Sequence, residues 1–161
     1  MRTRSTRKRE PSQVDTTTGT VVASCTRWSS CSTWVWNPPG RHVYEAIIGT
    51  PAGSNAQASS PAIAVTWVPA TVTLSASSSS ARAGSRVMLT ATVNENVGRT
   101  PWVIIITDLT TGTTIAYCRD GNECTTWVSH TSGSHSYQAV IAGPNGVNVQ
   151  ATSPTVTVTW R

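Results

Sequence analysis

Apolar and polar residues alternate along short stretches of the chain, and no stretch repeats its apolar residues at helical spacing. ATVTLSAS (70–77) and RVMLTATV (86–93) each place every second residue, all apolar, on one face. A period of two predicts a half-buried β-strand. WVIIITD (102–108) is apolar on both faces and predicts a central strand of a sandwich.

The rest of this region also predicts strands and turns. DLTTGT (108–113) predicts a hairpin turn, with Gly112 at the position that favours a positive φ. The stretch 75–85, rich in serine, predicts a long turn between the first two strands. Further strands are predicted in TTIAYC, TTWVSH, SYQAVIA and TVTVTW. About seven short strands between Val68 and Trp160 favour an all-β sandwich.

The chain repeats itself at an offset of 93 residues. Without a gap, 26 of the 53 positions from 15 to 67 are identical to those from 108 to 160. Residues 1–13 do not match 94–106, and no counterpart of 68–93 exists. A tandem repeat is therefore indicated. We expect a disordered basic tail at 1–13, a partial module at 14–67 that lacks its N-terminal strands, and a complete module at 68–161.

The strand pattern resembles the bacterial immunoglobulin-like domains over 68–160, and over their C-terminal half in 15–67. The resemblance implies tandem modules of secreted or cell-surface proteins. The stretch 133–137, GSHSY, resembles the tyrosine corner of immunoglobulin folds, in which a Tyr137 or Tyr44 hydroxyl would bond to nearby backbone. Ala46 and Ala139 stand where antibody domains have their second core cysteine, so that inter-sheet disulfide is not implied.

Four cysteines form two equivalent units, Cys25 with Cys31 and Cys118 with Cys124. Local disulfides are favoured, each stabilising by roughly 2–2.5 kcal/mol. Zinc ligation is disfavoured by the spacing, and free thiols remain an alternative. Disulfides imply an oxidising compartment, extracellular or on the cell surface. Since MRTRSTRKRE is not followed by the apolar core of a signal peptide, we expect a piece of a longer secreted protein.

Charge is concentrated at the N-terminus. Five cations and one acid in residues 1–10 carry four of the five net positive charges. A basic arm could bind nucleic acid or anionic lipid. No aromatic residue interrupts it and the rest of the chain is nearly neutral, so we expect no nucleic-acid partner. No apolar run is long enough for a membrane-spanning helix.

Little in the sequence points to catalysis. Asp15 and Asp108 recur at the same predicted turn, which indicates a role in the hairpin. His135 recurs as His42, which indicates a structural role. His130 and His135 could form a metal pair, but we expect no third ligand nearby. With no nucleophile elbow and no phosphate loop, we expect no enzyme, metal or cofactor.

The tryptophans divide into two groups. Trp34 and Trp67 recur as Trp127 and Trp160 and are expected in the core or at a module junction. Trp28 and Trp36 have no counterpart, and an aromatic residue on a rigid loop, as Trp28 is expected to be, is a candidate anchor for a glycan or a surface protein. Packing against a neighbouring module is the competing interpretation.

A structural function is favoured: a spacer or adhesion module that contacts other immunoglobulin-like modules or copies of itself. Glycan or protein binding through Trp28 and Trp36 is one alternative. The incomplete module allows three interpretations, since half a sandwich exposes an apolar face. The chain is a fragment, which is favoured; another chain adds strands and builds a dimer or filament; or the half module caps its neighbour.

Overall fold

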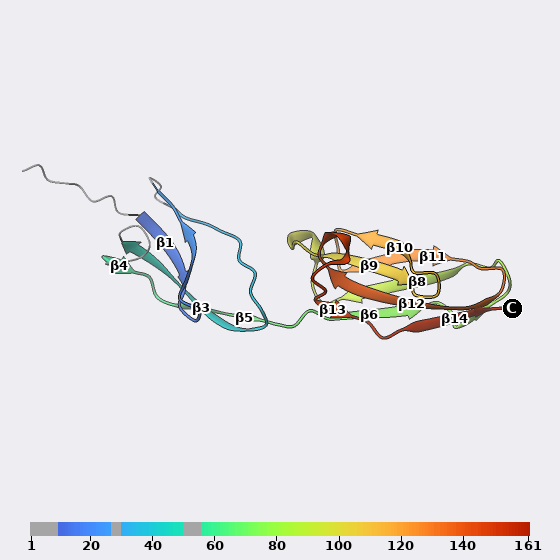
Figure 1. The fold of residues 1–161 in the computed structure, drawn as a ribbon. Coiled ribbons are helices and arrows are strands. Elements are labelled where there is room, and N and C mark those ends of the chain that lie inside the picture. The colour runs from blue at the N-terminus through green and yellow to red at the C-terminus, as the bar shows by residue number, and fades with distance from the viewer. Residues whose placement is uncertain (1–9, 27–29, 50–55) are drawn as a thin grey trace, which may run out of the picture. The chain divides into compact units, whose positions relative to one another are not determined.

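The computed structural model describes residues 10–26, 30–49 and 56–161 (Figure 1). The chain divides into two compact units, Met1–Pro69 and Ala70–Arg161, which we call unit 1 and unit 2. Over the described residues the regular elements are strands, apart from two 3₁₀ turns at Val97–Arg99 and Pro144–Gly146. No helix in these ranges has the length and apolar character needed to cross a membrane.

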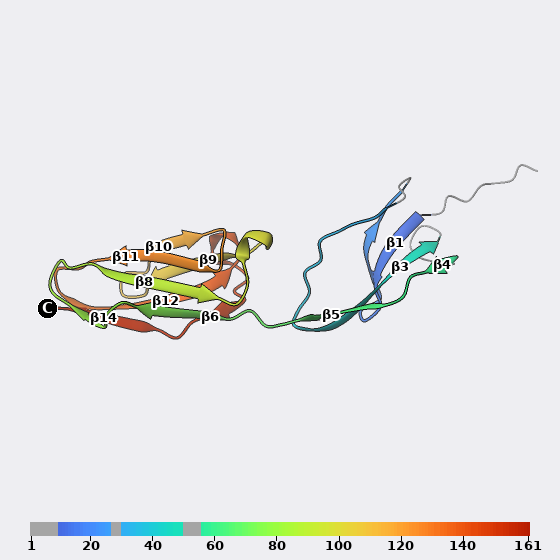
Figure 2. The same cartoon turned by 180° about the vertical axis from the view of Figure 1, so that it is seen from behind.

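Unit 2 is a sandwich of two sheets, visible as two layers in Figures 1 and 2. The smaller sheet has the order β11-β8-β6 and the larger the order β10-β9-β12-β14-β7, with β13 paired to β12. The strands are β6 (Val72–Ala76), β7 (Ser80–Ala81), β8 (Val87–Val93), β9 (Val103–Asp108), β10 (Thr113–Cys118), β11 (Glu123–Val128), β12 (Gly133–Ala142), β13 (Ala151–Thr152) and β14 (Val156–Trp160). This confirms the predicted all-β, immunoglobulin-like fold.

The core of unit 2 lies between the two sheets. The alternating residues Val87, Leu89 and Ala91 of β8 face Ile104 and Ile106 of β9, and all are buried. Burying a side chain of valine to isoleucine size contributes about 1.5–3 kcal/mol, so this layer is the main source of stability. The predicted long turn at 75–85 contains β7, which leaves the sheet of β6 and pairs in parallel with β14.

Unit 1 reproduces most of one sheet of unit 2. Its strands are β1 (Glu10–Asp15), β2 (Thr20–Ser24), β3 (Gly40–Gly49), β4 (Ala58–Ser59) and β5 (Ile63–Trp67). Shifted by 93, they fall on β9, β10, β12, β13 and β14, with the same partners. The described part of unit 1 has no counterpart of β6, β7 or β8. The described part of unit 1 therefore corresponds to the larger sheet of unit 2 without its short edge strand β7.

Residues 30–35 are the counterpart of β11 but form no strand. In unit 2, β11 pairs with β8 along its whole length, from Glu123↔Thr92 to Val128↔Val87. A strand needs a partner for its backbone groups. Since no described residue of unit 1 forms a counterpart of β8, this segment has no described strand to pair with.

Strand β1 begins at Glu10, inside the segment 1–13 that the sequence assigns to a disordered tail. Residues 10–13, EPSQ, show no apolar alternation, yet Glu10 pairs with Gly49 and Gln13 with Ala46. Because the distant strand β3 imposes this register, local sequence does not reveal it. The tail is therefore shorter than predicted at its C-terminal end, and residues 1–9 lie outside the described part of the chain.

Within the described residues, one face of the unit 1 sheet is uncovered except where the segment 30–37 contacts Gln13 and Tyr44. Val158 of β14 is 0% exposed whereas its counterpart Val65 is 37% exposed; Ile141 of β12 is 1% exposed and Ile48 is 44% exposed. Among the described residues, every buried apolar side chain belongs to unit 2. We call this surface the bare face; its residues are Tyr44, Ala46, Ile48, Ile63, Val65 and Trp67.

Candidate functional site

A cluster of polar side chains lies at one end of the unit 2 core. Asp108 ends β9, His135 and Tyr137 lie on β12, and His130 lies in the loop between β11 and β12. His135 Nδ1 donates to Asp108 Oδ2 over 2.8 Å, and His130 Nε2 is 4.0 Å from the same oxygen. His130 Nε2 is also hydrogen-bonded to the Tyr137 hydroxyl over 3.0 Å. Two imidazoles thus converge on one buried carboxylate.

Strand register and a hairpin position this carboxylate. Asp108 is directly opposite Tyr137 in the β9–β12 ladder, so its side chain shares a face with those of His135 and Tyr137. Its Oδ1 accepts from the Thr110 amide over 2.9 Å and from the Thr111 amide over 3.3 Å. Asp108 therefore has the predicted role in the hairpin turn, and its second oxygen, Oδ2, points at the histidines.

The imidazole rings are packed closely. The rings of His130 and His135 are stacked, with centroids 3.4 Å apart and planes 16° apart. The buried Trp160 indole meets both rings edge-on, at 4.8 Å from His130 and 5.9 Å from His135. Trp160 therefore forms the inner wall of the cluster.

Unit 1 contains a counterpart of the cluster with one change. His42 Nδ1 donates to Asp15 Oδ2 over 2.6 Å. Asn37 stands where unit 2 has His130, and its Nδ2 donates to the Tyr44 hydroxyl and, over 3.3 Å, to Asp15 Oδ2. The Asp–His–Tyr framework is therefore common to both units, and His130 is specific to unit 2.

The surroundings lower the pKa of Asp108 and that of His130 for different reasons. Burial raises the pKa of the Asp108 carboxyl, but the hydrogen bonds from His135 and from the Thr110 and Thr111 amides outweigh it and hold the pKa below its usual value. Burial, together with the neighbouring His135, lowers the pKa of His130. Burial and the nearby Asp108 charge raise the pKa of Tyr137 to about 12. At neutral pH the cluster thus holds a carboxylate and a neutral phenol.

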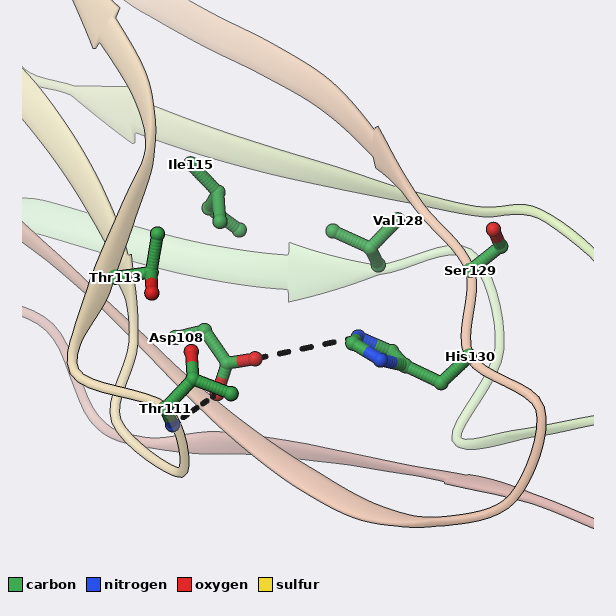
Figure 3. Close-up of a pocket in the computed structure, with 7 residues that line it drawn as sticks. All are labelled: Asp108, Thr111, Thr113, Ile115, Val128, Ser129 and His130. Carbon is green, nitrogen blue, oxygen red and sulfur yellow. Dashed lines mark hydrogen bonds and ion pairs between the residues drawn. The ribbon is translucent and has the colours of Figure 1, made fainter.

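An open pocket of about 280 Å³ leads to the cluster (Figure 3). Asp108 and His130 point toward one another at one side of it, while Ile115 and Val128 form an apolar side. Thr111, Thr113 and Ser129 add polar groups to its lining. The pocket thus exposes part of the His130 imidazole to solvent, while the Asp108 carboxylate beside it stays buried.

The structure corrects the expectation that no third ligand lies near His130 and His135. Asp108 is 22 and 27 residues away in sequence, yet one ligand atom from each of the three residues lies within 4.8 Å of the others. The sequence signal for this contact was that an aspartate and a histidine recur together, as Asp15 with His42 and as Asp108 with His135. A duplicated acid and a duplicated histidine favour contact with each other.

The tyrosines also depart from expectation. Within the described ranges each hydroxyl bonds to side chains rather than to the backbone: Tyr137 bonds to His130, and Tyr44 bonds to Asn37 and accepts from Trp67 Nε1 over 3.3 Å. Tyr137 lies mid-strand in β12 and is fully buried. Both tyrosines are part of the Asp–His framework.

Both predicted disulfides are present. Cys25 bonds to Cys31 and Cys118 to Cys124, each with Cα atoms 5.7 Å apart. In unit 2 the bond joins β10 of the larger sheet to β11 of the smaller sheet, and Cys124 is part of the core. It therefore links the two sheets, at a place different from the antibody disulfide.

The recurring tryptophans fulfil the core part of the prediction only in Trp160, and the module-junction alternative stays a prediction. Trp160 is buried as expected, but Trp34 is 76% exposed and Trp127 is 60% exposed, so neither is a core residue. In β11, Cys124 and Val128 face inward, and Trp127 is on the strand's outer side. Trp36 is half exposed, while Trp28 lies outside the described residues. Binding through Trp28 and Trp36 stays a prediction.

No family model matches the chain, and no curated protein matches it. Among solved structures, the fibronectin(III)-like modules of Clostridium thermocellum CbhA are similar at 16% sequence identity, with a TM-score of 0.36. The alignment covers 99% of this chain and 80% of that one. The fold assignment accordingly rests on the strand order and core of unit 2 described above.

Proposed function

We propose that this chain is a non-enzymatic spacer of an exported surface protein, and that unit 2 bears tension along the chain. The observation that carries this proposal is the parallel pairing of β7 with β14. The chain enters unit 2 ahead of β7 and leaves it after β14. Since the strands are parallel, pulling the two ends apart drags them in opposite directions and loads their hydrogen bonds together, in shear.

The contacts of this pair continue beyond its two registered positions. The Thr159 amide donates to Ser79 O over 3.0 Å, and the Arg161 amide donates to Ala81 O over 3.0 Å. The Ala83 amide donates back to Arg161 O over 3.1 Å. The disulfide between β10 and β11 adds a covalent link between the sheets. Disulfides of this kind also support an extracellular location.

Arg161→Pro is expected to lower the force at which unit 2 unfolds when the full chain is stretched from its ends. Proline removes the amide donor to Ala81 O, and the extended strand tolerates its ring otherwise. Single-molecule force spectroscopy measures the peak force. Gln150→Pro is the matched control, because it removes one backbone donor, to Ile141 O, outside the pair. Equal weakening by both substitutions would argue against a mechanical role for β7 and β14.

A second candidate function, self-association, is favoured by the bare face of unit 1. In unit 2 the equivalent surface is covered by β6, β8 and β11. If these strands moved onto the unit 1 sheet of another chain, they would leave the larger sheet of their own unit 2 uncovered. One sheet face per chain would therefore stay exposed. Two copies that pack their bare faces together would cover both. We therefore propose a face-to-face dimer rather than a strand-exchanged filament.

The chemistry of the bare face suits such packing. Ile48, Ile63 and Val65 are apolar and exposed. Among the described residues of this side of the sheet, the charged group is Asp15, which is already paired to His42. Burial of the face would therefore remove apolar area from water without desolvating an unpaired charge.

Val65→Asp is expected to shift the protein from dimer to monomer, because it places a carboxylate in the middle of the proposed contact. Light scattering across a concentration series measures the molar mass. Thr66→Asp is the matched control, since it adds the same charge on the opposite side of β5 and should leave the dimer intact. A wild-type protein that is monomeric at every concentration would exclude this dimer.

A further inference from the structure

Asp108, His130 and His135 form a set of side chains with ligand chemistry that the mechanical role of unit 2 does not use. We propose that they bind a divalent transition-metal ion, with Zn²⁺ as the best match, at a site whose fourth position is open to the pocket. Two imidazoles and one carboxylate are a donor set that zinc accepts, and three protein ligands leave one coordination position free.

The distances suit this ion. Ligand atoms around tetrahedral zinc, with bonds of about 2.0–2.1 Å, lie about 3.3–3.4 Å apart. The two distances to Asp108 Oδ2, 2.8 Å from His135 Nδ1 and 4.0 Å from His130 Nε2, lie on either side of that value. The stacked rings must splay so that both nitrogens point at the ion. The pocket beside His130 gives its ring room to do so (Figure 3).

The carboxylate is held as a metal ligand needs to be. Asp108 Oδ1 is fixed by the Thr110 and Thr111 amides, which keeps Oδ2 directed at the histidines. Such outer contacts orient ligands and raise affinity. On binding, zinc would take the place of the proton between His135 Nδ1 and Asp108 Oδ2, and the neutral imidazole would carry its ring proton on Nε2 instead. His130 Nε2 would exchange its hydrogen bond to the Tyr137 hydroxyl for a bond to the ion.

Comparison of the two units distinguishes the contacts that support the fold from the group that would bind the metal ion. In unit 1, Asn37 makes the contacts to the acid and the tyrosine that stabilise the framework. A histidine is therefore not required at this position for the hydrogen bonds. What His130 adds is an imidazole that faces the pocket, 27% exposed at its side chain, beside a buried carboxylate.

The test is zinc binding to the full chain, measured by isothermal titration calorimetry with ZnCl₂ as the probe. Wild-type protein is expected to bind one zinc ion per chain and to melt at a higher temperature with zinc than with EDTA. His130→Asn gives unit 2 the arrangement found in unit 1. It should lose at least tenfold in affinity while its melting temperature in EDTA stays close to that of wild type.

Asn37→His provides the converse test, because it would place a histidine beside Asp15 and His42 and so give unit 1 the same three ligand types as unit 2. A second zinc ion per chain is the expected result, and a stoichiometry of one would count against the proposal. The proposal is also overturned if wild-type protein takes up no zinc at millimolar concentration, or if His130→Asn binds within threefold of wild type.

Discussion

Replacing Trp160 with alanine is expected to lower the free energy of unfolding of unit 2 by about 3–5 kcal/mol. The indole is 1% exposed, closes the core beside β14, and packs edge-on against the two stacked imidazoles. Its Nε1 also donates to Ser85 O over 2.9 Å, which ties the segment before β8 to β14. Truncation of Trp160 to alanine would leave a cavity and would also remove the hydrogen bond to Ser85 O.

Urea denaturation followed by circular dichroism measures the loss, with the unit 2 transition fitted separately. Trp67→Ala is the matched control, because Trp67 occupies the equivalent position in unit 1 but is only partly buried. It should leave the unit 2 transition unchanged and remove much less stability from unit 1. If the two substitutions weaken their own units equally, the unit 1 sheet is covered in solution.

Much of the fold was predictable because the repeat and the alternation agree. The offset of 93 residues maps β9, β10, β12, β13 and β14 onto the strands of unit 1. What the alignment did not show is that the strands retained in unit 1 all belong to one sheet. Sheet membership depends on pairing between distant strands, and a linear alignment does not contain it.

The polar strand at Glu10–Gln13 was missed for a related reason. Its partner β3 determines its register, and Gln13 compensates for lost apolar packing by donating to Cys31 O over 2.7 Å. In unit 2 the same position is Ile106, a core residue. The described part of unit 1 has no second sheet, and there a polar side chain that bonds to the loop stands in place of an apolar core residue.

The site was predictable only in part. The recurrence of Asp15 with Asp108 and of His42 with His135 indicated structural roles, and in each unit the acid and the histidine are hydrogen-bonded to each other. That Asp108 and His130 lie together depends on the β9–β12 register and on the path of the loop after β11. Neither is visible in sequence spacing. The exposure of Trp127, in contrast, follows from the alternation of β11 and could have been inferred.

Asp108→Ala is expected to destabilise unit 2 by at least about 2 kcal/mol at neutral pH, because it leaves several donors without their acceptor. The carboxylate accepts from the Thr110 and Thr111 amides and from His135 Nδ1, and the residue is 2% exposed. Asp108→Asn should cost less, since an amide oxygen can still accept from the turn amides. Urea unfolding of unit 2 in EDTA measures both.

The Asp108 carboxylate also makes the free energy of unfolding of unit 2 depend on pH in the acid range, and the direction of this dependence follows from the shift of its pKa. The pKa of Asp108 is held below its usual value in the folded state, so the group contributes stability above the unfolded pKa of about 3.9. This contribution is lost as pH falls through the folded pKa. The free energy of unfolding of wild-type unit 2 should therefore decline below about pH 4, and Asp108→Asn should flatten that decline. Glu95→Gln, which removes an exposed carboxylate, is the matched control; if it flattens the decline as much as Asp108→Asn, the Asp108 hydrogen bonds are not the origin of the acid sensitivity.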